Sequence, residues 1–458
     1  MRVGRVSNLK VTGYGCRVSP NYERLSRRVV SPLTGLSRSL GFMMRGRDEP
    51  KVVVSGAQLT GVERLSGRRG GLTYHIGGCG MNLSESLIRS LGETIERYAQ
   101  VVTPLYLGSQ AVFSTTKDMK EQGKDTLVGP FARLFSDKQY ATQGFHYSPL
   151  FDDSPITWAR TEGLTEPGTV WVPAQLLYIG YQVRRQDGEP WLNSAVTTGS
   201  AAHTSPRLAL RSALYELIHA DAAMGHWYTT RSAPRIRLDS RVENFKELIG
   251  DALQRSQVQP SFHYLELPGF DVHVTACVMR SRVGSGRGHN LGLGVSSDLE
   301  GSLYRSFIEA AAGIQLSKML RISPELVDGA STARTSDTSQ MLDLDANVAY
   351  YAGQQGAEIL DQKFSLHSHI DAKDLPPDRK SSVEEDISSV VNGYRRMGGR
   401  LVFSDCTTAE ARRLGFYVPR VWSPDTISLC LPSAPPLNHP RFRNYGGIDH
   451  AYLPHPYA

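Results

Sequence analysis

The chain has 458 residues, of which 40% are hydrophobic and 21% charged, and its formal net charge is +6. This is the composition of an ordinary globular protein, and the length allows two or three units of ~150 residues. It argues against a membrane-spanning protein, because no apolar run approaches the ~20 residues that a span needs. The first residues, MRVGRVSNLK, lack the apolar stretch of a signal peptide, so we do not expect export.

The cysteines are few, scattered and odd in number, and none belongs to a CxxC or Cys/His pattern with zinc spacing. Isolated cysteines of this kind favour a reduced, cytoplasmic protein. They are Cys16, Cys79, Cys277, Cys406 and Cys430.

Basic residues crowd the N-terminus, at Arg2, Arg5, Lys10, Arg17, Arg24, Arg27 and Arg28. Such an arm is compatible with nucleic acid, but no basic motif interleaved with aromatic residues supports that partner. A phosphate-bearing ligand or an acidic peptide explains the charge equally well.

The stretch 74–100, YHIGGCGMNLSESLIRSLGETIERYAQ, predicts a short strand end, a glycine turn and a long helix. One side of this helix is apolar, while Glu93, Glu96 and Arg97 lie on the opposite side. Taken alone, this stretch favours a solvated i,i+4 ion pair between Glu93 and Arg97.

A second helix begins at Pro206, after the segment 192–203, which is rich in small and hydroxyl residues. Glu216 and His219 share its polar face. Asp221 returns to the apolar side, where it is either a residue at a fraying helix end or a buried functional carboxylate.

A third helix, SLYRSFIEAAAGIQLSKML, follows the glycine-rich stretch 284–294 and carries Arg305 and Glu309 opposite its apolar face. Further elements are predicted by alternation and turn signals. They are a turn at SPLTGL, a strand within 51–65, two strands around EPGT in 151–181, a helix at 242–256, a hairpin at 262–280, a helix near 347–361, a polar loop at 366–381, a helix at 383–397, the strands LVFSD and YVPRVW with a short helix between them, and a proline-rich end.

A weak internal repeat links the three helices, because each follows a glycine-rich or small-residue turn and carries a glutamate on its polar face. Glu93 comes 13 residues after Gly80, Glu216 comes 17 after Gly199, and Glu309 comes 15 after Gly294. We therefore expect related strand–turn–helix units packed around one centre.

Carboxylates that converge from several helices repel one another unless a cation lies between them. Mg²⁺ is the cation that carboxylates hold together with substrate phosphates, and Arg97 and Arg305 are suited to bind phosphate or carboxylate. Neither a P-loop nor a kinase signature is present. The residues predict a Mg²⁺–nucleotide site that is not built on a P-loop.

The sequence resembles the YcaO family. The resemblance covers roughly residues 30–458 and rests on several motifs that occur in the same order. They are SPLTGL (31–36), GGCGMN (77–82), SLGETIERY (90–98), TTGSAAH (197–203), ALYELIHADA (213–222), SLYRSFIEAA (302–311), SDCTTAEARRLGFYVPRVW (404–422) and the terminal PHPYA.

The resemblance implies an α/β (α+β) fold, with repeated strand–glycine-turn–helix units around a central ATP site. It implies an N-terminal basic arm and lead-in at 1–50 and a catalytic domain at 51–458, with a proline-rich tail at 432–458. In this family ATP phosphorylates a backbone amide oxygen of a ribosomal precursor peptide. A Cys, Ser or Thr side chain then forms a thiazoline or oxazoline. A thioamide- or amidine-forming member and a catalytically degenerate scaffold subunit are the alternatives.

Site residues follow from the match of motifs. The expected Mg²⁺ ligands are Glu93, Glu96, Glu216, Asp221 and Glu309. The expected nucleotide contacts are Arg97, Ser200, Glu216, Arg305 and Gln315. Catalytic roles are expected for Pro454, Pro456 and Ala458 in the tail.

The resemblance also implies partners. These are the precursor peptide, a ThiF-type (ubiquitin-activating-enzyme-like) protein that binds its leader, and in some members a flavin-dependent azoline dehydrogenase, in a homo- or hetero-oligomer. Neither nucleic acid nor a membrane is expected.

This chain departs from the family pattern at several positions. Arg89 stands where the first helix has Ser, and Gly78-Cys79-Gly80 replaces a glycine-lysine-glycine turn. The other departures are His219 for a metal-binding Glu, Ala312 and Ile314 for Gln and Arg, and Ala458 for the last proline of the tail.

Overall fold

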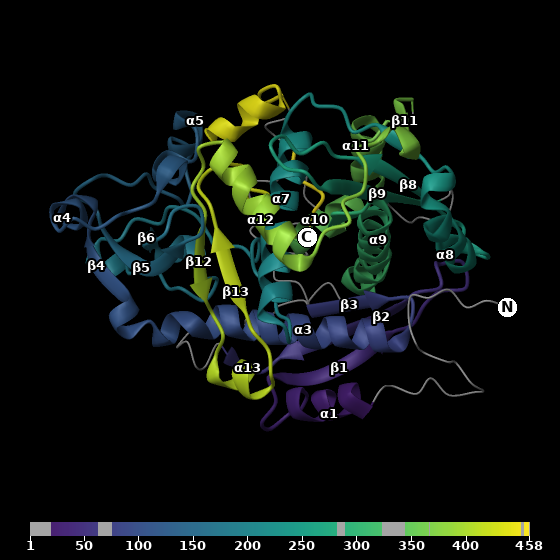
Figure 1. Cartoon of the computed structure of the whole chain (residues 1–458), viewed down its shortest axis with the longest axis horizontal. Coiled ribbons are helices and arrows are strands. Elements are labelled where there is room, and N and C mark those ends of the chain that lie inside the picture. Colours follow the sequence, from purple (N-terminus) through teal and green to yellow (C-terminus); the bar gives the residue numbers. More distant parts are fainter. Residues whose placement is uncertain are drawn as a thin grey trace.

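The computed structural model describes residues 20–62, 76–281, 289–322, 344–365, 367–449 and 453–457. In these residues three sheets are flanked by helices, so the predicted α/β fold class is confirmed (Figure 1). No helix among them combines the length and apolarity needed to cross a membrane. The basic arm expected at the N-terminus lies mostly outside the described residues, as do Cys16 and Ala458.

The first sheet has the order β1-β2-β3, with antiparallel pairs throughout. The long helix α3 packs on β2 and β3 and buries Leu87, Leu91 and Ile95. Asn82 caps α3, since its side chain accepts a hydrogen bond from the Glu85 N–H. The elements are α1 (Pro20–Val29), β1 (Ser37–Met43), β2 (Val53–Leu59), β3 (Ile76–Gly80) and α3 (Leu83–Val102).

The second sheet has the order β10-β9-β8-β7-β11, and α9 packs on β9 and β10. The hairpin predicted over 262–280 is confirmed, because β8 and β9 pair antiparallel. The elements are β7 (Arg235–Arg237), α8 (Glu243–Leu253), β8 (Val258–Tyr264), β9 (His273–Ser281), β10 (Asn290–Ser296), α9 (Leu299–Ile322) and β11 (His369–Asp371).

The third sheet has the order β13-β12-β5-β4, with β6 paired to β5, and α7 packs between β13 and β10. The two strands predicted around EPGT are β5 and β6. The strands are β4 (Ala111–Thr115), β5 (Pro155–Gly163), β6 (Thr169–Pro173), β12 (Val402–Asp405) and β13 (Pro419–Trp422). The helices are α4 (Thr116–Glu121), α5 (Asp137–Tyr140), α6 (Ala174–Leu177), α7 (Pro206–Tyr228), α10 (Asp345–Tyr351), α11 (Gln354–Lys363), α12 (Val383–Arg396) and α13 (Ala409–Arg413).

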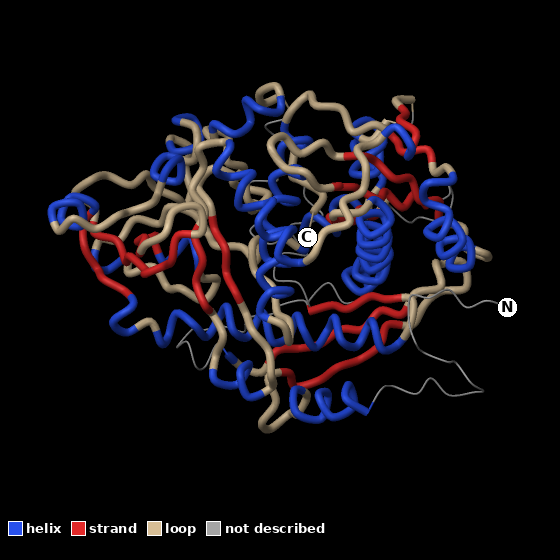
Figure 2. The backbone as a smooth tube through the Cα atoms, viewed as in Figure 1, coloured by secondary structure: helices blue, strands red, loops and turns tan. Residues whose placement is uncertain are grey.

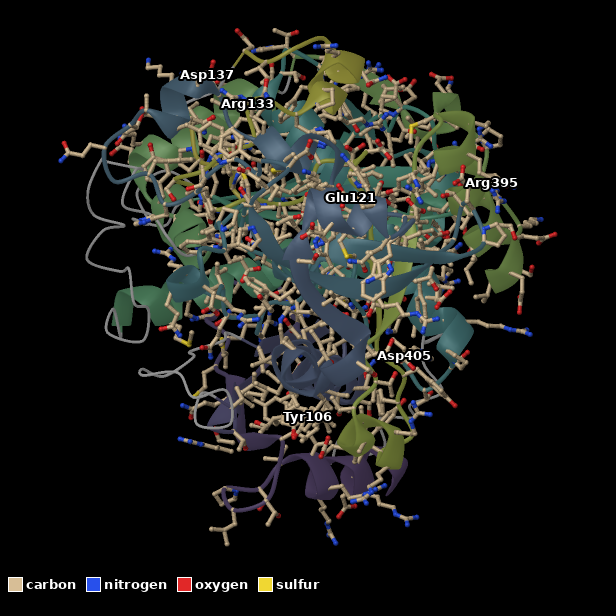
Figure 3. All side chains as sticks on the ribbon, turned by 90° about the vertical axis from the view of Figure 1, so that its left-hand side faces the viewer. Tyr106, Glu121, Arg133, Asp137, Arg395 and Asp405 are labelled. Carbon is tan, nitrogen blue, oxygen red and sulfur yellow. The ribbon has the colours of Figure 1, made fainter. Side chains whose placement is uncertain are left out.

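The side of the molecule at which the third sheet lies carries scattered exposed charge. Figure 3 shows Glu121, Arg133, Asp137, Arg395 and Asp405 spread over it, and all five are exposed. Long loops join the elements at this end of the molecule, as the tan segments of Figure 2 show.

Three sequence predictions about local structure were wrong. The glycines of GGCG lie in β3, and residues 290–294 of the glycine-rich stretch lie in β10, so neither set forms a turn. The helix predicted near 347–361 is two helices, α10 and α11, which a break at 352–353 separates. The predicted loop at 366–381 contains the short strand β11, while Leu366 lies outside the described residues.

The strand glycines have a packing role instead. A Cβ atom added to Gly78 would overlap the carbonyl of Ser86, and one added to Gly294 would overlap the carbonyl of Ser302. In both places a serine eight residues later donates its hydroxyl to the glycine carbonyl, with distances of 2.9 Å (Ser86 to Gly78) and 3.0 Å (Ser302 to Gly294). The glycines therefore let a helix backbone lie directly on the strand.

These contacts make β2-β3-α3 and β9-β10-α9 matched ββα units. Gly78 pairs with Ser55 across the first sheet, and Gly294 pairs with Thr275 across the second. Ser55 Oγ lies 2.8 Å from Ser90 Oγ, and Thr275 Oγ lies 3.2 Å from Ser306 Oγ. The predicted repeat thus corresponds to a physical match for two of the three helices, with Gly78 rather than Gly80 as the counterpart of Gly294.

Replacing Gly78 by alanine is expected to destabilise the fold by about 1–3 kcal/mol, the usual cost of overpacking a close contact. Gly41→Ala is the matched control, because Gly41 also lies in a strand but has no atom within 4 Å of an added Cβ. Guanidinium-induced unfolding of both variants and the wild type measures the difference. Equal stability of Gly78→Ala and the wild type would contradict the packing role.

Candidate functional site

A cavity of about 660 Å³ opens where α3, α7 and α9 approach one another. Figure 1 shows α3 running across the lower part of the molecule, with α7 and α9 above it. The loop at 197–204 and the C-terminal tail complete the walls. Among the predicted site residues, the cavity is lined by Glu93, Glu96, Arg97, Ser200, Glu216, Arg305, Glu309 and Pro456.

On α3, Arg97 bridges the two glutamates. Its Nη2 donates to Glu93 Oε1 at 3.0 Å, and its Nη1 donates to Glu96 Oε1 at 3.2 Å. The i,i+4 pair predicted from the sequence exists, but it is not a solvated surface pair. The side chains of Arg97 and Glu93 are only 18% and 27% exposed, and both line the cavity.

Glu93 and Glu309 are held in the same way at matched positions of the two ββα units. Glu93 Oε2 accepts the N–H of Gly77 at 3.1 Å, and Glu309 Oε2 accepts the N–H of Leu293 at 3.1 Å. In both cases the N–H belongs to a residue 16 positions earlier in the chain. The strand backbone thus fixes one carboxylate on each helix.

Ser200 supports the second glutamate of α3. Its hydroxyl donates to Glu96 Oε1, and its backbone bridges that of Arg420 in β13. Gly199, with φ of 88°, makes the turn that brings this loop against β13, where its carbonyl accepts the N–H of Val421 at 2.8 Å.

The negative charges of the glutamates around the cavity repel one another. Burial, together with the charges of Glu216 and Glu93, raises the pKa of Glu309 to about 8. Burial also raises the pKa of Glu96, against the opposing effects of Arg97 and the Ser200 hydroxyl. Four glutamates around one cavity therefore favour a bound cation, which would remove this repulsion.

The donor set fits Mg²⁺, since it consists of carboxylate oxygens. Within the described residues, no three His, Cys, Asp or Glu side chains already stand close enough together to hold a metal ion. Glu93, Glu96, Glu216 and Glu309 therefore surround the cavity without forming a finished coordination shell. Mg²⁺ commonly completes its shell with water and nucleotide phosphates, which agrees with this arrangement.

The tail reaches the cavity. Tyr351 donates its hydroxyl to the carbonyl of Pro454, and Asn347 Nδ2 donates to the carbonyl of Tyr457 at 3.1 Å. His455 Nε2 lies 2.6 Å from the carbonyl of Cys430, so the segment is fixed along its length. Pro456 and Tyr457 line the cavity, whereas Ala458 lies outside the described residues.

Asp221 is not placed with the other carboxylates. It is fully buried in an ion pair with Arg441, with 2.7 Å between Arg441 Nη2 and Asp221 Oδ2. It also accepts hydrogen bonds from the Tyr445 hydroxyl at 2.9 Å and the Ile427 N–H at 2.9 Å. The helix α7 continues to Tyr228, so Asp221 is not a fraying end either. Its position on the apolar face directs it into the core, and we leave it out of the metal set.

Gln315 is also separate from the cavity. Its Nε2 donates to the buried Glu49 Oε2 at 2.7 Å, and Lys318 Nζ contacts the same oxygen at 3.0 Å. The side chain of Gln315 thus ties α9 to the segment before β2. Gln315 is therefore not among the nucleotide contacts that we propose.

The departures from the family pattern have defined places. Arg89 and Ala312 line the cavity, while Ile314 is buried in the core. His219 is buried at the cavity wall, with its Nε2 3.6 Å from Glu216 Oε2. Cys79 is buried, which raises the pKa of its thiol to about 12 and leaves it unreactive.

Sequence reasoning missed Arg420 and Tyr457. Arg420 is buried in β13, and its Nε and Nη1 have no hydrogen-bond partner among the described residues. Burial lowers its pKa to about 10, against the charges of Cys406 and Glu96, so it adds positive potential near Glu96. The sequence feature that could have indicated Arg420 is an arginine inside the otherwise apolar strand YVPRVW. For Tyr457 there was no signal beyond its place in the tail.

Comparison with known proteins finds a family model that matches most of the chain. Residues 77–427 match the family model described as YcaO cyclodehydratase, ATP- and Mg²⁺-binding. No curated protein matches the sequence.

Several solved structures share the fold. A heterocyclase in complex with substrate and cofactor has a TM-score of 0.72 and 18% identity, over 97% of this chain and 58% of that one. YcaO from Methanopyrus kandleri bound with AMPPCP and Mg²⁺ has a TM-score of 0.57 and 17% identity, over 88% of this chain and 87% of that one. The E. coli microcin synthetase McbBCD complex has a TM-score of 0.60 and 14% identity, over 92% of this chain and 96% of its own, and it is also solved with pro-MccB17 bound. This chain thus spans only 58% of the first structure's length.

The raised pKa of Glu309 predicts a pH dependence of stability in metal-free protein. Its value of about 8 in the folded chain exceeds the ordinary ~4.3, so the folded state holds a proton that the unfolded state releases. Stability should therefore fall as the pH rises from about 4 to about 8 and level off above that.

Thermal melting in the presence of a chelator measures this slope. Glu309→Gln removes the titrating group and should flatten the slope, while the exposed Glu121→Gln should leave it unchanged. An unaltered slope in Glu309→Gln would show that burial does not raise this pKa.

Proposed function

The chain belongs to the YcaO family of ATP- and Mg²⁺-binding cyclodehydratases, and on this premise we propose that it modifies a ribosomally made precursor peptide. The proposed reaction converts Cys, Ser or Thr residues of that peptide into thiazolines or (methyl)oxazolines at the expense of ATP.

The observation that carries the proposal is the charge arrangement of the cavity. Glu93, Glu96, Glu216 and Glu309 converge from three helices, and Arg97 and Arg305 lie among them. Carboxylates suit Mg²⁺, guanidinium groups suit phosphate, and the two together suit a magnesium–nucleotide complex. Mg²⁺ bound there would neutralise charge on the transferring phosphoryl group.

The chemistry removes one water from the peptide for each ring. The amide oxygen takes the γ-phosphoryl group of ATP, and the side-chain sulfur or oxygen of the next residue attacks the carbonyl carbon. Phosphate then leaves with that oxygen, so ATP and the peptide yield ADP, phosphate and the azoline. The enzyme's task is to bring the amide oxygen in line with the terminal phosphate and to exclude water from it.

Individual residues divide this task. The four glutamates hold the cation, and the Ser200 hydroxyl keeps Glu96 oriented toward the cavity. Arg97 and Arg305 contact the phosphates. The tail, through Pro454, Pro456 and Ala458, borders the place where the peptide reacts and helps to position it.

The proposed partners are those that the resemblance to the family implies. They are a precursor peptide, a ThiF-type protein that binds its leader and, if azolines are oxidised to azoles, a flavin-dependent dehydrogenase. A hetero-oligomeric assembly is supported by the similarity to the McbBCD complex.

A catalytically degenerate scaffold subunit is the second candidate. Ala312 at the cavity wall and Ile314 in the core offer no polar group where the family pattern has Gln and Arg. A thioamide- or amidine-forming enzyme is less well supported, because the tail that reaches the cavity resembles that of azoline formers.

With its cognate partner and precursor peptide, the purified protein should release one phosphate per ring and lower the peptide mass by one water each time. Mass spectrometry and a phosphate assay measure the two quantities. Phosphate release without loss of water would exclude cyclodehydration, and absence of both would favour the scaffold.

Glu96→Gln should weaken Mg²⁺–ATP binding by about 100-fold or more, because even groups that only support a metal ligand contribute about 10–100-fold to affinity. Isothermal titration calorimetry measures the dissociation constant. Glu121→Gln, which removes an exposed glutamate outside the cavity, is the control. If Glu96→Gln binds as tightly as the wild type, Glu96 is not a metal ligand.

A further inference from the structure

Two arginines occupy matched positions in the two ββα units. Arg89 lies four residues before Glu93 on α3, and Arg305 lies four residues before Glu309 on α9. Since Glu93 and Glu309 are bound by matched strand N–H groups, the two arginines have matched positions relative to these glutamates. Both arginines line it.

The two arginines repel each other. Burial lowers the pKa of Arg305, and the charges of Arg89 and Arg211 lower it further, against the effect of Glu216. Arg211 is partly neutralised by Asp386, with 3.5 Å between Arg211 Nη1 and Asp386 Oδ2, and it does not line the cavity. Among the described residues Arg305 has neither a hydrogen bond nor an ion pair.

Arg89 is held in place without being fully neutralised. Its Nη2 donates to Glu85 Oε1 at 2.9 Å. The other oxygen of Glu85 accepts the hydroxyl of Tyr304 at 2.6 Å and the N–H of Met81 at 3.0 Å. Because Tyr304 belongs to α9, this one carboxylate connects Arg89 to the helix that carries Arg305.

Arg97, in contrast, is committed to carboxylates. It donates to both Glu93 and Glu96, so its capacity to bind a further anion is reduced. Among the three arginines that line the cavity, Arg89 and Arg305 therefore have the most remaining capacity to bind an anion.

We propose that Arg89 and Arg305 form one binding site for the phosphate chain of a nucleoside triphosphate. This inference rests on the proposed nucleotide function and assigns the chain's departure at Arg89 a role in it. A planar guanidinium donates two parallel hydrogen bonds to phosphate oxygens, and a chain of linked phosphates is long enough to contact two such groups at once. An anion between them also removes the repulsion that the unliganded pair suffers.

Isothermal titration calorimetry of the full chain in Mg²⁺ tests the site with two ligands, ATP and inorganic triphosphate. Arg89→Gln should weaken both by about tenfold, which corresponds to about 1.4 kcal/mol. Arg27→Gln is the matched control, because Arg27 pairs with Glu23 in the same i,i+4 arrangement but lies on α1, outside the cavity. Its affinities should equal those of the wild type.

The outcomes separate this inference from the proposed function. Wild-type affinity of Arg89→Gln for both ligands overturns the arginine site and leaves nucleotide binding standing. If the wild type binds triphosphate but not ATP, and Arg89→Gln weakens the triphosphate binding, the arginines bind linked phosphates but the nucleotide function is overturned. Binding of neither ligand by the wild type overturns both.

A second variant keeps the test decisive if Arg89→Gln misfolds. Arg89→Lys keeps the charge that Glu85 requires but loses the planar fork, so its affinity for triphosphate should lie between those of the wild type and Arg89→Gln. If Arg89→Gln does not fold, unchanged triphosphate affinity in Arg89→Lys overturns the site.

Discussion

The repulsion among four carboxylates in one cavity is the constraint on which the site depends. A cluster of this kind costs stability unless a cation occupies it, because burial disfavours every charge that its neighbours also repel. The raised pKa values of Glu309 and Glu96 reflect this cost, because burial disfavours their charged forms. It offsets part of it with Arg97 inside the cavity and with the buried Arg420 behind Ser200.

The two matched ββα units give the site its geometry. Glycine in the strand and serine on the helix bring each helix onto its sheet, and a strand N–H then fixes one glutamate in each unit. The units differ one turn further along the helix. There α3 carries Glu96 and Arg97, whereas α9 carries Ala312 and Gly313. The match supplies a symmetric pair of carboxylates and guanidinium groups, and the difference makes α3 the more highly charged wall.

The sequence predicted the elements that periodicity and turn residues specify, including the three long helices and the hairpin of β8 and β9. It also predicted Glu93, Glu96, Glu216 and Glu309 at one centre, because their place opposite an apolar face is a property of the helix alone. It could not distinguish a strand glycine from a turn glycine, since that depends on the helix packed against it. The sequence could not place Asp221 and Gln315 outside the cavity for a similar reason, because their partners, Arg441 and Glu49, lie far away in the chain. Arg420 and Tyr457 acquire their place only when β13 and the tail fold back.

The central claim is that the cavity holds a cation with its nucleotide and that Glu309 gives up its proton when they bind. Calorimetric titration of Mg²⁺–ATP near neutral pH, repeated in buffers of different ionisation enthalpy, counts the protons released on binding. Since the pKa of Glu309 is about 8 without ligand, the wild type should release protons and Glu309→Gln should release fewer. Binding of Mg²⁺–ATP with no proton release by the wild type would contradict the account.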